Sequence, residues 1–299
     1  MKVGVVLPLF SGDPGKVIDA ARETEDLGFD GAFVFDHFFP PGAPRDRPAL
    51  EAFTTLAAVA AATERIAVGT LVTRISLRPA GMLAKLGAWL DTASGGRLIL
   101  GMGTGDPIDR PEHEAYGIRL PGRQERRAHL EETIVAVKAL WRGERYEGGR
   151  LVPPLEGPVV PPPARAGGPP VWLGAQADEV VRIAGRWADG WNGWGLGPQP
   201  FRKKADLLAE EAARGGRRAE ATWAGIVLAG ADQVELKDLS ERRRARGLDD
   251  EAWTGTTEEL TAHLRELEAA GATWAVMVVA GPADRRELIA KQVLPALAQ

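Results

Sequence analysis

Residues 14–37, PGKVIDAARETEDLGFDGAFVFDH, contain one complete helix–strand unit and decide the fold. Their first half has the apolar spacing of an amphipathic helix, Pro14–Leu27, and Gly28 ends that helix. Their second half contains the run Gly31–Phe35, which is apolar throughout and does not alternate, as expected of a strand buried on both faces. The polar pair Asp36 and His37 follows directly. This unit predicts an α/β protein with a parallel sheet.

The same unit recurs along the chain. The predicted strands are Val3–Leu7, Gly31–Phe35, Ile66–Val72, Arg97–Gly101, Val171–Gly174, Gly190–Trp194, Thr222–Leu228 and Trp274–Val279. The predicted helices are Pro14–Leu27, Pro48–Thr63, Pro79–Asp91, Arg123–Trp141, Asp178–Trp187, Pro200–Gly215, Thr257–Ala270 and Asp284–Leu297. Eight such units predict a closed (β/α)8 TIM barrel, and an open doubly wound sheet is the structural alternative.

Two stretches interrupt the alternation. Residues 143–170, before the fifth strand, are dense in proline and glycine, and residues 231–255 follow the seventh strand. We expect a single domain, residues 1–299, with these two insertions. The second one contains the basic run Arg242–Arg246, which we interpret as a solvated helical turn, with anion binding as the alternative.

Composition excludes several functional classes. The chain has 299 residues, of which 44% are hydrophobic and 26% charged, and a formal net charge of -4. This balance predicts no nucleic-acid or membrane partner. The absence of cysteine excludes thiolate chemistry, and four isolated histidines without an HExxH motif predict no histidine-built metal site. Because no signal peptide or membrane-length apolar stretch is present, we expect a soluble, cytoplasmic protein.

In a TIM barrel, functional residues lie at the carboxyl ends of the strands. Asp36 and His37 occupy such an end, where a carboxylate beside an imidazole either handles a proton near neutral pH or only stabilises the turn. The run GMGTGD, residues 101–106, is no dinucleotide fingerprint, so its glycines either admit a flat ring or turn the chain. Residues 174–176, before a helix, offer amides to an anion or are an ordinary helix start. The crowded Trp187, Trp191 and Trp194 predict core packing or the wall of an aromatic cofactor site.

Five stretches carry a resemblance to one known family. They are ARETEDLGFDGAFVFDH (21–37), TERIAVGTLV (63–72), LAKLGAWLDTASGGRLILGMGTG (83–105), PVWLGAQADEVVRIAGRWADGWN (170–192) and GTTEELTAHLRELEAAGATWA (255–275). Together they resemble the luciferase-like flavin and deazaflavin oxidoreductases. The resemblance covers nearly the whole chain apart from the two insertions. It implies a (β/α)8 barrel with the cofactor ring across the strand ends, and a dimer.

The resemblance also assigns residues to roles. It implies His37 and Asp106 as catalytic residues that handle the proton and the developing charge. The cofactor-binding residues that it implies are Asp36, Thr70, Leu71, Val72, Gly103, Thr104, Gly105, Gly174, Ala175 and Gln176, where many relatives have glycine at the position of Ala175. It further implies that the Leu71–Val72 peptide is cis, whereas the physics of strand ends alone favours a trans bulge.

We expect coenzyme F420 as the cofactor, with FMN as the alternative. The Gly-Thr-Gly-acid stretch at 103–106 resembles the deazaflavin-dependent sugar-phosphate dehydrogenases, but Pro40–Pro41 stands where that branch has a tryptophan. The predicted function is hydride transfer between F420 and a small organic substrate. The alternatives are an FMN-dependent monooxygenase that uses oxygen and a non-catalytic ligand-binding barrel.

Overall fold

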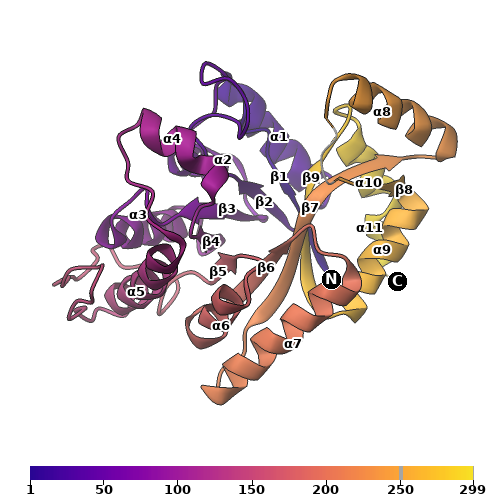
Figure 1. Ribbon diagram of the computed structural model, residues 1–299. Coiled ribbons are helices and arrows are strands. Elements are labelled where there is room, and N and C mark those ends of the chain that lie inside the picture. Colours follow the sequence, from indigo (N-terminus) through magenta and orange to yellow (C-terminus); the bar gives the residue numbers. More distant parts are fainter. Residues whose placement is uncertain (249–251, 299) are drawn as a thin grey trace.

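Eight parallel strands close into a barrel in the computed structural model, which describes residues 1–248 and 252–298 (Figure 1). Each strand pairs with the next, and the last pairs with the first through Lys2–Val5 and Trp274–Met277. The barrel strands are β1 (Lys2–Val6), β2 (Gly31–Val34), β3 (Ala67–Arg74), β4 (Leu98–Gly103), β5 (Val171–Gly174), β6 (Gly190–Trp194), β7 (Glu220–Gly230) and β9 (Ala272–Val279). The closed (β/α)8 barrel is thus confirmed, and the open sheet is excluded.

A ninth strand, β8 (Trp253–Thr256), lies outside the barrel. Strand β7 is long enough to pair with β6 along residues 220–224 and with β8 along residues 227–230. The helix α8 (Gln233–Ala245) connects β7 to β8. The second insertion is therefore largely regular: the stretch expected to be irregular contains a helix of 13 residues and a strand, and the basic run closes the helix.

Helices surround the barrel and connect its strands. They are α1 (Pro14–Asp26), α2 (Ala52–Ala62), α3 (Ala80–Ala93), α5 (Arg123–Trp141), α6 (Asp178–Trp187), α7 (Pro198–Arg214), α9 (Thr257–Ala269), α10 (Arg285–Gln292) and α11 (Leu294–Leu297). The helix α2 begins four residues later than predicted, because the Glu51 side chain caps it by accepting from the Thr54 amide at 2.7 Å. A 3-10 turn, η1 (Pro107–Asp109), and the short helix α4 (Arg110–Ala115) follow β4.

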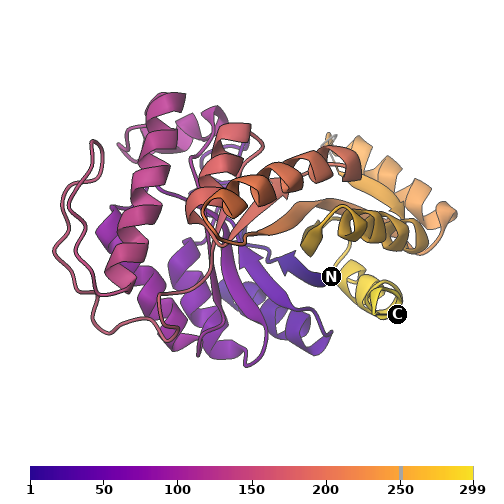
Figure 2. The same ribbon diagram turned by 90° about the horizontal axis from the view of Figure 1, so that it is seen from below.

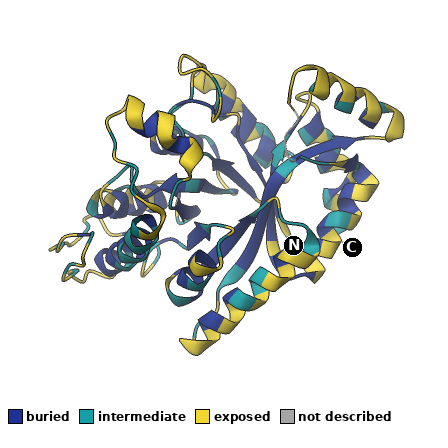
Figure 3. Cartoon of the chain, in the orientation of Figure 1, coloured by how far each residue is buried: buried dark blue, intermediate teal, exposed yellow. Residues whose placement is uncertain are grey.

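The core has two layers, one outside and one inside the sheet. The outer layer lies between strands and helices, and the helices expose their opposite faces to solvent (Figure 3). The inner layer fills the barrel with aromatic rings: Phe33 stacks on Trp172, with ring centroids 5.6 Å apart, and Trp274 meets both rings edge-on. Each such side chain contributes roughly 1.5–3 kcal/mol by leaving water. The interior is therefore a packed core, and ligands must bind at its open ends.

The first insertion runs over the outside of the molecule near α3 and α5 (Figure 2). Among residues 143–170 the structure has one isolated bridge, Tyr146–Leu155, and no helix or strand. Arg165 holds the segment to α3 through the buried Asp91, at 2.5 Å. None of the described helices combines the length and the apolar character needed to cross a bilayer.

Candidate functional site

Aromatic side chains meet at the carboxyl ends of the barrel strands. Phe35, just after β2, contacts Phe10, His37 and Trp194 with ring centroids 6.0, 6.2 and 5.9 Å apart. All four side chains are partly exposed. Trp194, at the end of β6, belongs to this exposed layer, whereas Trp191 is buried in the outer core and Trp187 lies on the surface of α6.

Strand β3 is irregular where it reaches this end. Its pairing with β4 shifts register between Thr70 and Thr73, and the Leu71–Val72 peptide between them is cis, as predicted. The Thr70 hydroxyl donates to the Gly101 carbonyl at 2.7 Å and is buried. Leu71 points into the barrel core, while Val72 stays half-buried at the rim.

The glycines of β4 and β5 are required by this irregularity. A Cβ on Gly101 would lie 2.2 Å from the Thr70 carbonyl oxygen, and one on Gly103 would lie 2.5 Å from Cγ2 of Val72. A Cβ on Gly174 would lie 2.9 Å from Cγ1 of the same valine. Distances below about 3.5 Å between carbon atoms are repulsive. The glycine-rich run therefore allows β3 to pack against its neighbours, while Gly105 adds a turn with φ of 71°.

The buried carboxylate of Asp36 anchors the connection after β3. It accepts from the Thr73 hydroxyl at 2.6 Å and from Nη1 and Nη2 of Arg78 at 2.6 and 3.1 Å. Burial lowers the pKa of Arg78, but its bonds to Asp36 and Glu51 outweigh burial and raise that pKa above its ordinary value. Asp36 is 3% exposed, so its contribution to the site is to hold the β3 end in place.

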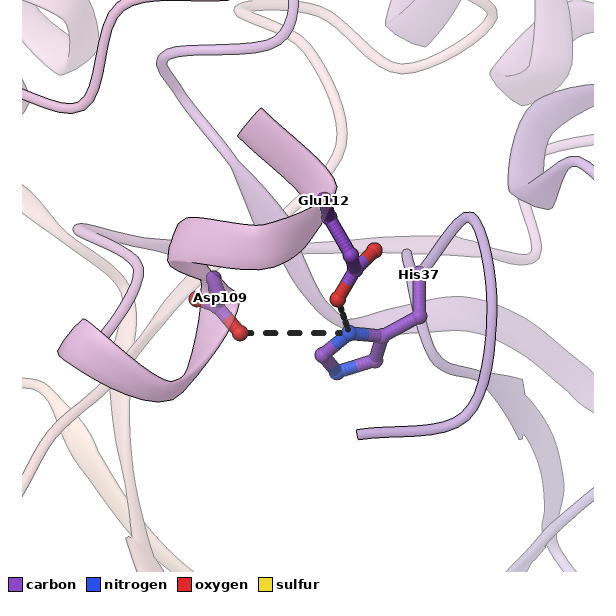
Figure 4. A group of neighbouring side chains, drawn as sticks. All are labelled: His37, Asp109 and Glu112. Carbon is purple, nitrogen blue, oxygen red and sulfur yellow. Dashed lines mark hydrogen bonds and ion pairs between the residues drawn. The ribbon is translucent and has the colours of Figure 1, made fainter. Parts of the chain in front are cut away.

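His37 meets the segment that follows β4. Its Nδ1 lies 2.7 Å from Oε1 of Glu112, whose Oε2 accepts from the Phe38 amide at 2.6 Å and from Nη2 of Arg74 at 2.8 Å. Asp109 lies farther away, with Oδ1 3.9 Å from the same ring nitrogen. Figure 4 shows that both carboxylates approach Nδ1, while Nε2 of His37 points away from them.

Glu112, Asp109 and Arg74 were missed by sequence reasoning. A usable signal was the spacing of the acids at 106, 109 and 112 after β4. Residues three apart share one face of a helical turn, so acids with that spacing meet the same neighbour. That neighbour is His37, which is 75 residues from Glu112 in sequence, so the contact can be recognised only in the folded structure.

Asp106 and Thr104 lie on the same segment. The Asp106 amide donates to Oδ2 of Asp109 at 2.7 Å, while its own side chain is exposed. Thr104 is half-buried and donates to the Gly105 carbonyl at 3.1 Å. Asp109 thus holds the Asp106 backbone by a hydrogen bond and lies 3.9 Å from His37.

The loop after β5 is fixed to β6. The Ala175 amide donates to the Asn192 carbonyl at 3.2 Å, and the Ala175 carbonyl accepts from the Trp191 indole at 2.7 Å. The Gln176 side chain donates to the Trp194 carbonyl at 2.8 Å. These bonds orient the start of α6 toward the same rim as Trp194 and Phe35.

His37, Asp109 and Glu112 also have the ligand types of a divalent-cation site, with ligand atoms within 4.8 Å of one another. The buried Arg74 already contacts this group: its Nη1 lies 3.8 Å from Asp109 and its Nη2 2.8 Å from Glu112. A guanidinium at that position supplies the positive charge that a metal ion would bring. We therefore interpret the group as a hydrogen-bonded network.

The chain is similar to several known proteins. A family model described as luciferase-like monooxygenase matches residues 1–287. An F420-dependent glucose-6-phosphate dehydrogenase of Nakamurella multipartita is 33% identical over 184 residues, which cover 59% of this chain and 51% of that protein. A protein of the same name from Beutenbergia cavernae is 31% identical over 233 residues, with coverages of 75% and 64%. The chain thus spans about half the length of several curated relatives that it matches.

A solved structure, an F420-dependent secondary alcohol dehydrogenase in complex with an F420-acetone adduct, superposes with a TM-score of 0.85. The alignment covers 99% of this chain and 98% of that one at 18% sequence identity. At that identity the likeness concerns the fold, and it supports the (β/α)8 barrel.

Proposed function

Because the chain belongs to the luciferase-like monooxygenase family, we propose that it is an oxidoreductase that uses coenzyme F420 to exchange a hydride with a small organic substrate. The observation that carries this proposal is the apolar layer at the strand ends. Phe35, Val72 and Trp194 keep part of their surface exposed there, and the His37 ring lies beside Phe35. Exposed apolar and aromatic surface with one polar group beside it suits a flat ring and its reacting substrate.

The residues at the rim fit a deazaflavin ring. Strands β4 and β5 end in Gly103 and Gly174, and Val72 fills the space that a Cβ on either glycine would occupy. The two glycines therefore leave room for Val72, whose half-buried side chain is the apolar surface on which we propose that the ring lies. When bound, the cofactor supplies the carbon that gives or accepts the hydride.

The first turn of α6 fits an anionic tail. The amides of a first helical turn have no acceptor within the helix and favour negative charge. Two acids stand in this turn, but Asp178 is paired with Lys204, whose hydrogen bond lowers the Asp178 pKa, and Glu179 lies 3.4 Å from Arg127. With both acids paired, we propose that the amides after Ala175 and Gln176 bind the phosphate.

His37 and Asp106 complete the proposal. We assign proton exchange with the substrate to Nε2 of His37, because Nδ1 is occupied by Glu112. We assign the exposed Asp106 carboxylate to the developing charge, since its backbone is fixed by Asp109. General acid–base catalysis by one positioned side chain contributes about 100-fold or more to the rate.

A second candidate function is an FMN-dependent monooxygenase that consumes oxygen. The description of the matching family model favours it. The same rim would hold the ring and the same α6 amides the phosphate, so binding experiments must separate the two cofactors.

The test is to titrate the apoprotein with F420 and with FMN while recording tryptophan fluorescence. We expect micromolar or tighter affinity for F420 and weaker affinity for FMN. Because F420 carries the longer anionic tail, its affinity should fall more steeply as salt rises. As a control, His37→Ala should keep F420 affinity within a few-fold and reduce turnover by about 100-fold. Equal or tighter FMN binding, with oxygen consumption when a flavin reductase is present, would establish the second candidate instead.

We further propose that residues 1–299 act as one domain, in the cytoplasm, as a homodimer. The family resemblance supports the dimer, and so do Met82 and Trp89, which are 55% and 51% exposed on α3. Large exposed apolar side chains on one helix are typical of interfaces. Sedimentation of the wild type and of Trp89→Lys checks this proposal: the wild type should sediment as a dimer and the variant as a monomer.

A further inference from the structure

We propose that Glu112 is a positioning residue, which holds His37 with a proton on Nδ1 and leaves Nε2 to exchange a proton with substrate. The inference rests on the proposed function for the role of Nε2. The state of the ring can be measured without cofactor or substrate.

The Glu112 carboxylate is fixed by three donors. Oε1 meets Nδ1 of His37 at 2.7 Å, and Oε2 accepts from the Phe38 amide at 2.6 Å and from Nη2 of Arg74 at 2.8 Å. Glu112 is 1% exposed, so no water competes for these bonds. A carboxylate held on two sides cannot turn away from the ring, and the ring keeps one orientation.

The charge of Glu112 determines where the ring proton sits. Burial raises the pKa of Glu112, but the hydrogen bonds from His37 and Phe38 and the charges of His37 and Arg74 outweigh burial and hold that pKa below its ordinary value. Glu112 is therefore ionised at neutral pH and can only accept hydrogen bonds. Nδ1 must then be the donor, and in the neutral ring Nε2 is the atom that can take up a proton.

Asp109 also faces the same ring nitrogen, and Arg74 faces the two acids. Asp109 Oδ1 lies 3.9 Å away, beyond hydrogen-bond distance, so Asp109 acts through its charge alone. Arg74 approaches both acids and offsets one of the two negative charges. Asp109 thereby offers a matched control, with the same charge as Glu112 and no hydrogen bond to His37.

The segment that carries Glu112 is docked beside His37 at a second point. Tyr116, directly after α4, packs on Phe38 with ring centroids 4.3 Å apart, although its own side chain is largely exposed. The segment therefore contacts Phe38 twice: Glu112 accepts a hydrogen bond from the Phe38 amide, and Tyr116 packs on the Phe38 ring. These two contacts hold the Glu112 carboxylate beside Nδ1 of His37.

The first experiment is nitrogen NMR of the histidine rings in protein without cofactor, with His37→Asn used for assignment. In the wild type we expect the Nδ1–H form of the neutral ring. In Glu112→Gln the single amide oxygen accepts from the two donors Phe38 and Arg74, so the amide nitrogen donates to Nδ1 and the neutral ring should change to the Nε2–H form. Asp109→Asn should leave the Nδ1–H form in place, because Asp109 makes no hydrogen bond to the ring. An Nδ1–H ring in Glu112→Gln, or an Nε2–H ring in the wild type, would overturn the proposal.

The second experiment measures hydride transfer with F420. Glu112→Gln should lower kcat by about 10- to 100-fold with F420 affinity within a few-fold, and should change the pH profile of kcat. If Glu112 only stabilised the fold, Tm would fall while kcat per folded molecule and the pH profile stayed as in the wild type. A wild type with the expected ring state but no F420 activity would contradict the proposed function and leave the positioning role intact. Ring signals that respond to pH only after EDTA is added would identify a metal site and overturn the role.

Discussion

Replacing Gly103 by alanine tests whether the rim depends on close packing around Val72. The new Cβ would lie 2.5 Å from Cγ2 of Val72, about 1 Å inside the optimal separation of two carbon atoms. No positive φ is involved at Gly103, so the cost comes from the contact alone. Overpacking of this size costs about 2 kcal/mol. With an unfolding entropy of about 2.1 cal/mol/K per residue, a chain of 299 residues should lose about 3 °C in Tm.

A double-mutant cycle isolates this contact. Val72→Ala removes both Cγ atoms, so Gly103→Ala should cost little in that background, with a coupling energy of about 2 kcal/mol. Calorimetry gives the stabilities, and F420 titration shows whether the displaced Val72 weakens binding. Gly12→Ala is the control, because its Cβ would make an ordinary contact of 3.7 Å with Pro48 in an exposed loop. Gly103→Ala as stable as this control, or no rescue by Val72→Ala, would refute the packing argument.

Three further predictions concern stability. Asp36→Asn should cost about 3 kcal/mol in urea unfolding, because it leaves the half-buried Arg78 with one acid in place of two; a loss below about 1 kcal/mol would contradict the anchoring role. In helix α3, Gly81→Ala should stabilise the protein by about 0.5 kcal/mol by restricting the unfolded chain, since its Cβ would have an ordinary contact at 3.7 Å. Gly87→Ala in the same helix should destabilise it, because its Cβ would lie 2.6 Å from an indole ring, and the reverse order in thermal melts would show the argument to be wrong. Although burial raises the pKa of Glu112, its hydrogen bonds and neighbouring charges hold that pKa below the unfolded value. Its stabilisation is therefore present at neutral pH and lost as pH falls, so the advantage of wild type over Glu112→Gln should shrink between about pH 6 and pH 3 in urea titrations.

The fold was predictable because each unit of the barrel is local. A helix of period 3.6 followed by an apolar run such as Gly31–Phe35 can be recognised within 25 residues, and eight repetitions leave few topologies. Strand β8 escaped prediction because its four residues, Trp253–Thr256, form only when the end of β7 is free to pair. Nothing in so short a stretch distinguishes a strand from a loop.

The candidate site was predictable in position and only partly in composition. His37 and Asp106 follow from the rule that barrel sites lie at strand ends. The partner of His37 does not, because three acids follow β4 and only the fold selects Glu112 at 2.7 Å over Asp109 at 3.9 Å. The roles of glycines such as Gly103 also depend on a neighbouring strand.

The two pairings of strand β7 have a consequence for engineering. Strand β7 closes the barrel by pairing with β6 and with β9. Its pairing with β6 ends at Ala224, and its pairing with β9 ends at Val227. Beyond that point the only strand of the described residues that pairs with β7 is β8, and α8 lies between the two in sequence. Residues 228–256 can therefore be exchanged as a unit. Replacing them with the corresponding stretch of a relative would alter one edge of the rim and leave the pairings among the eight barrel strands unchanged.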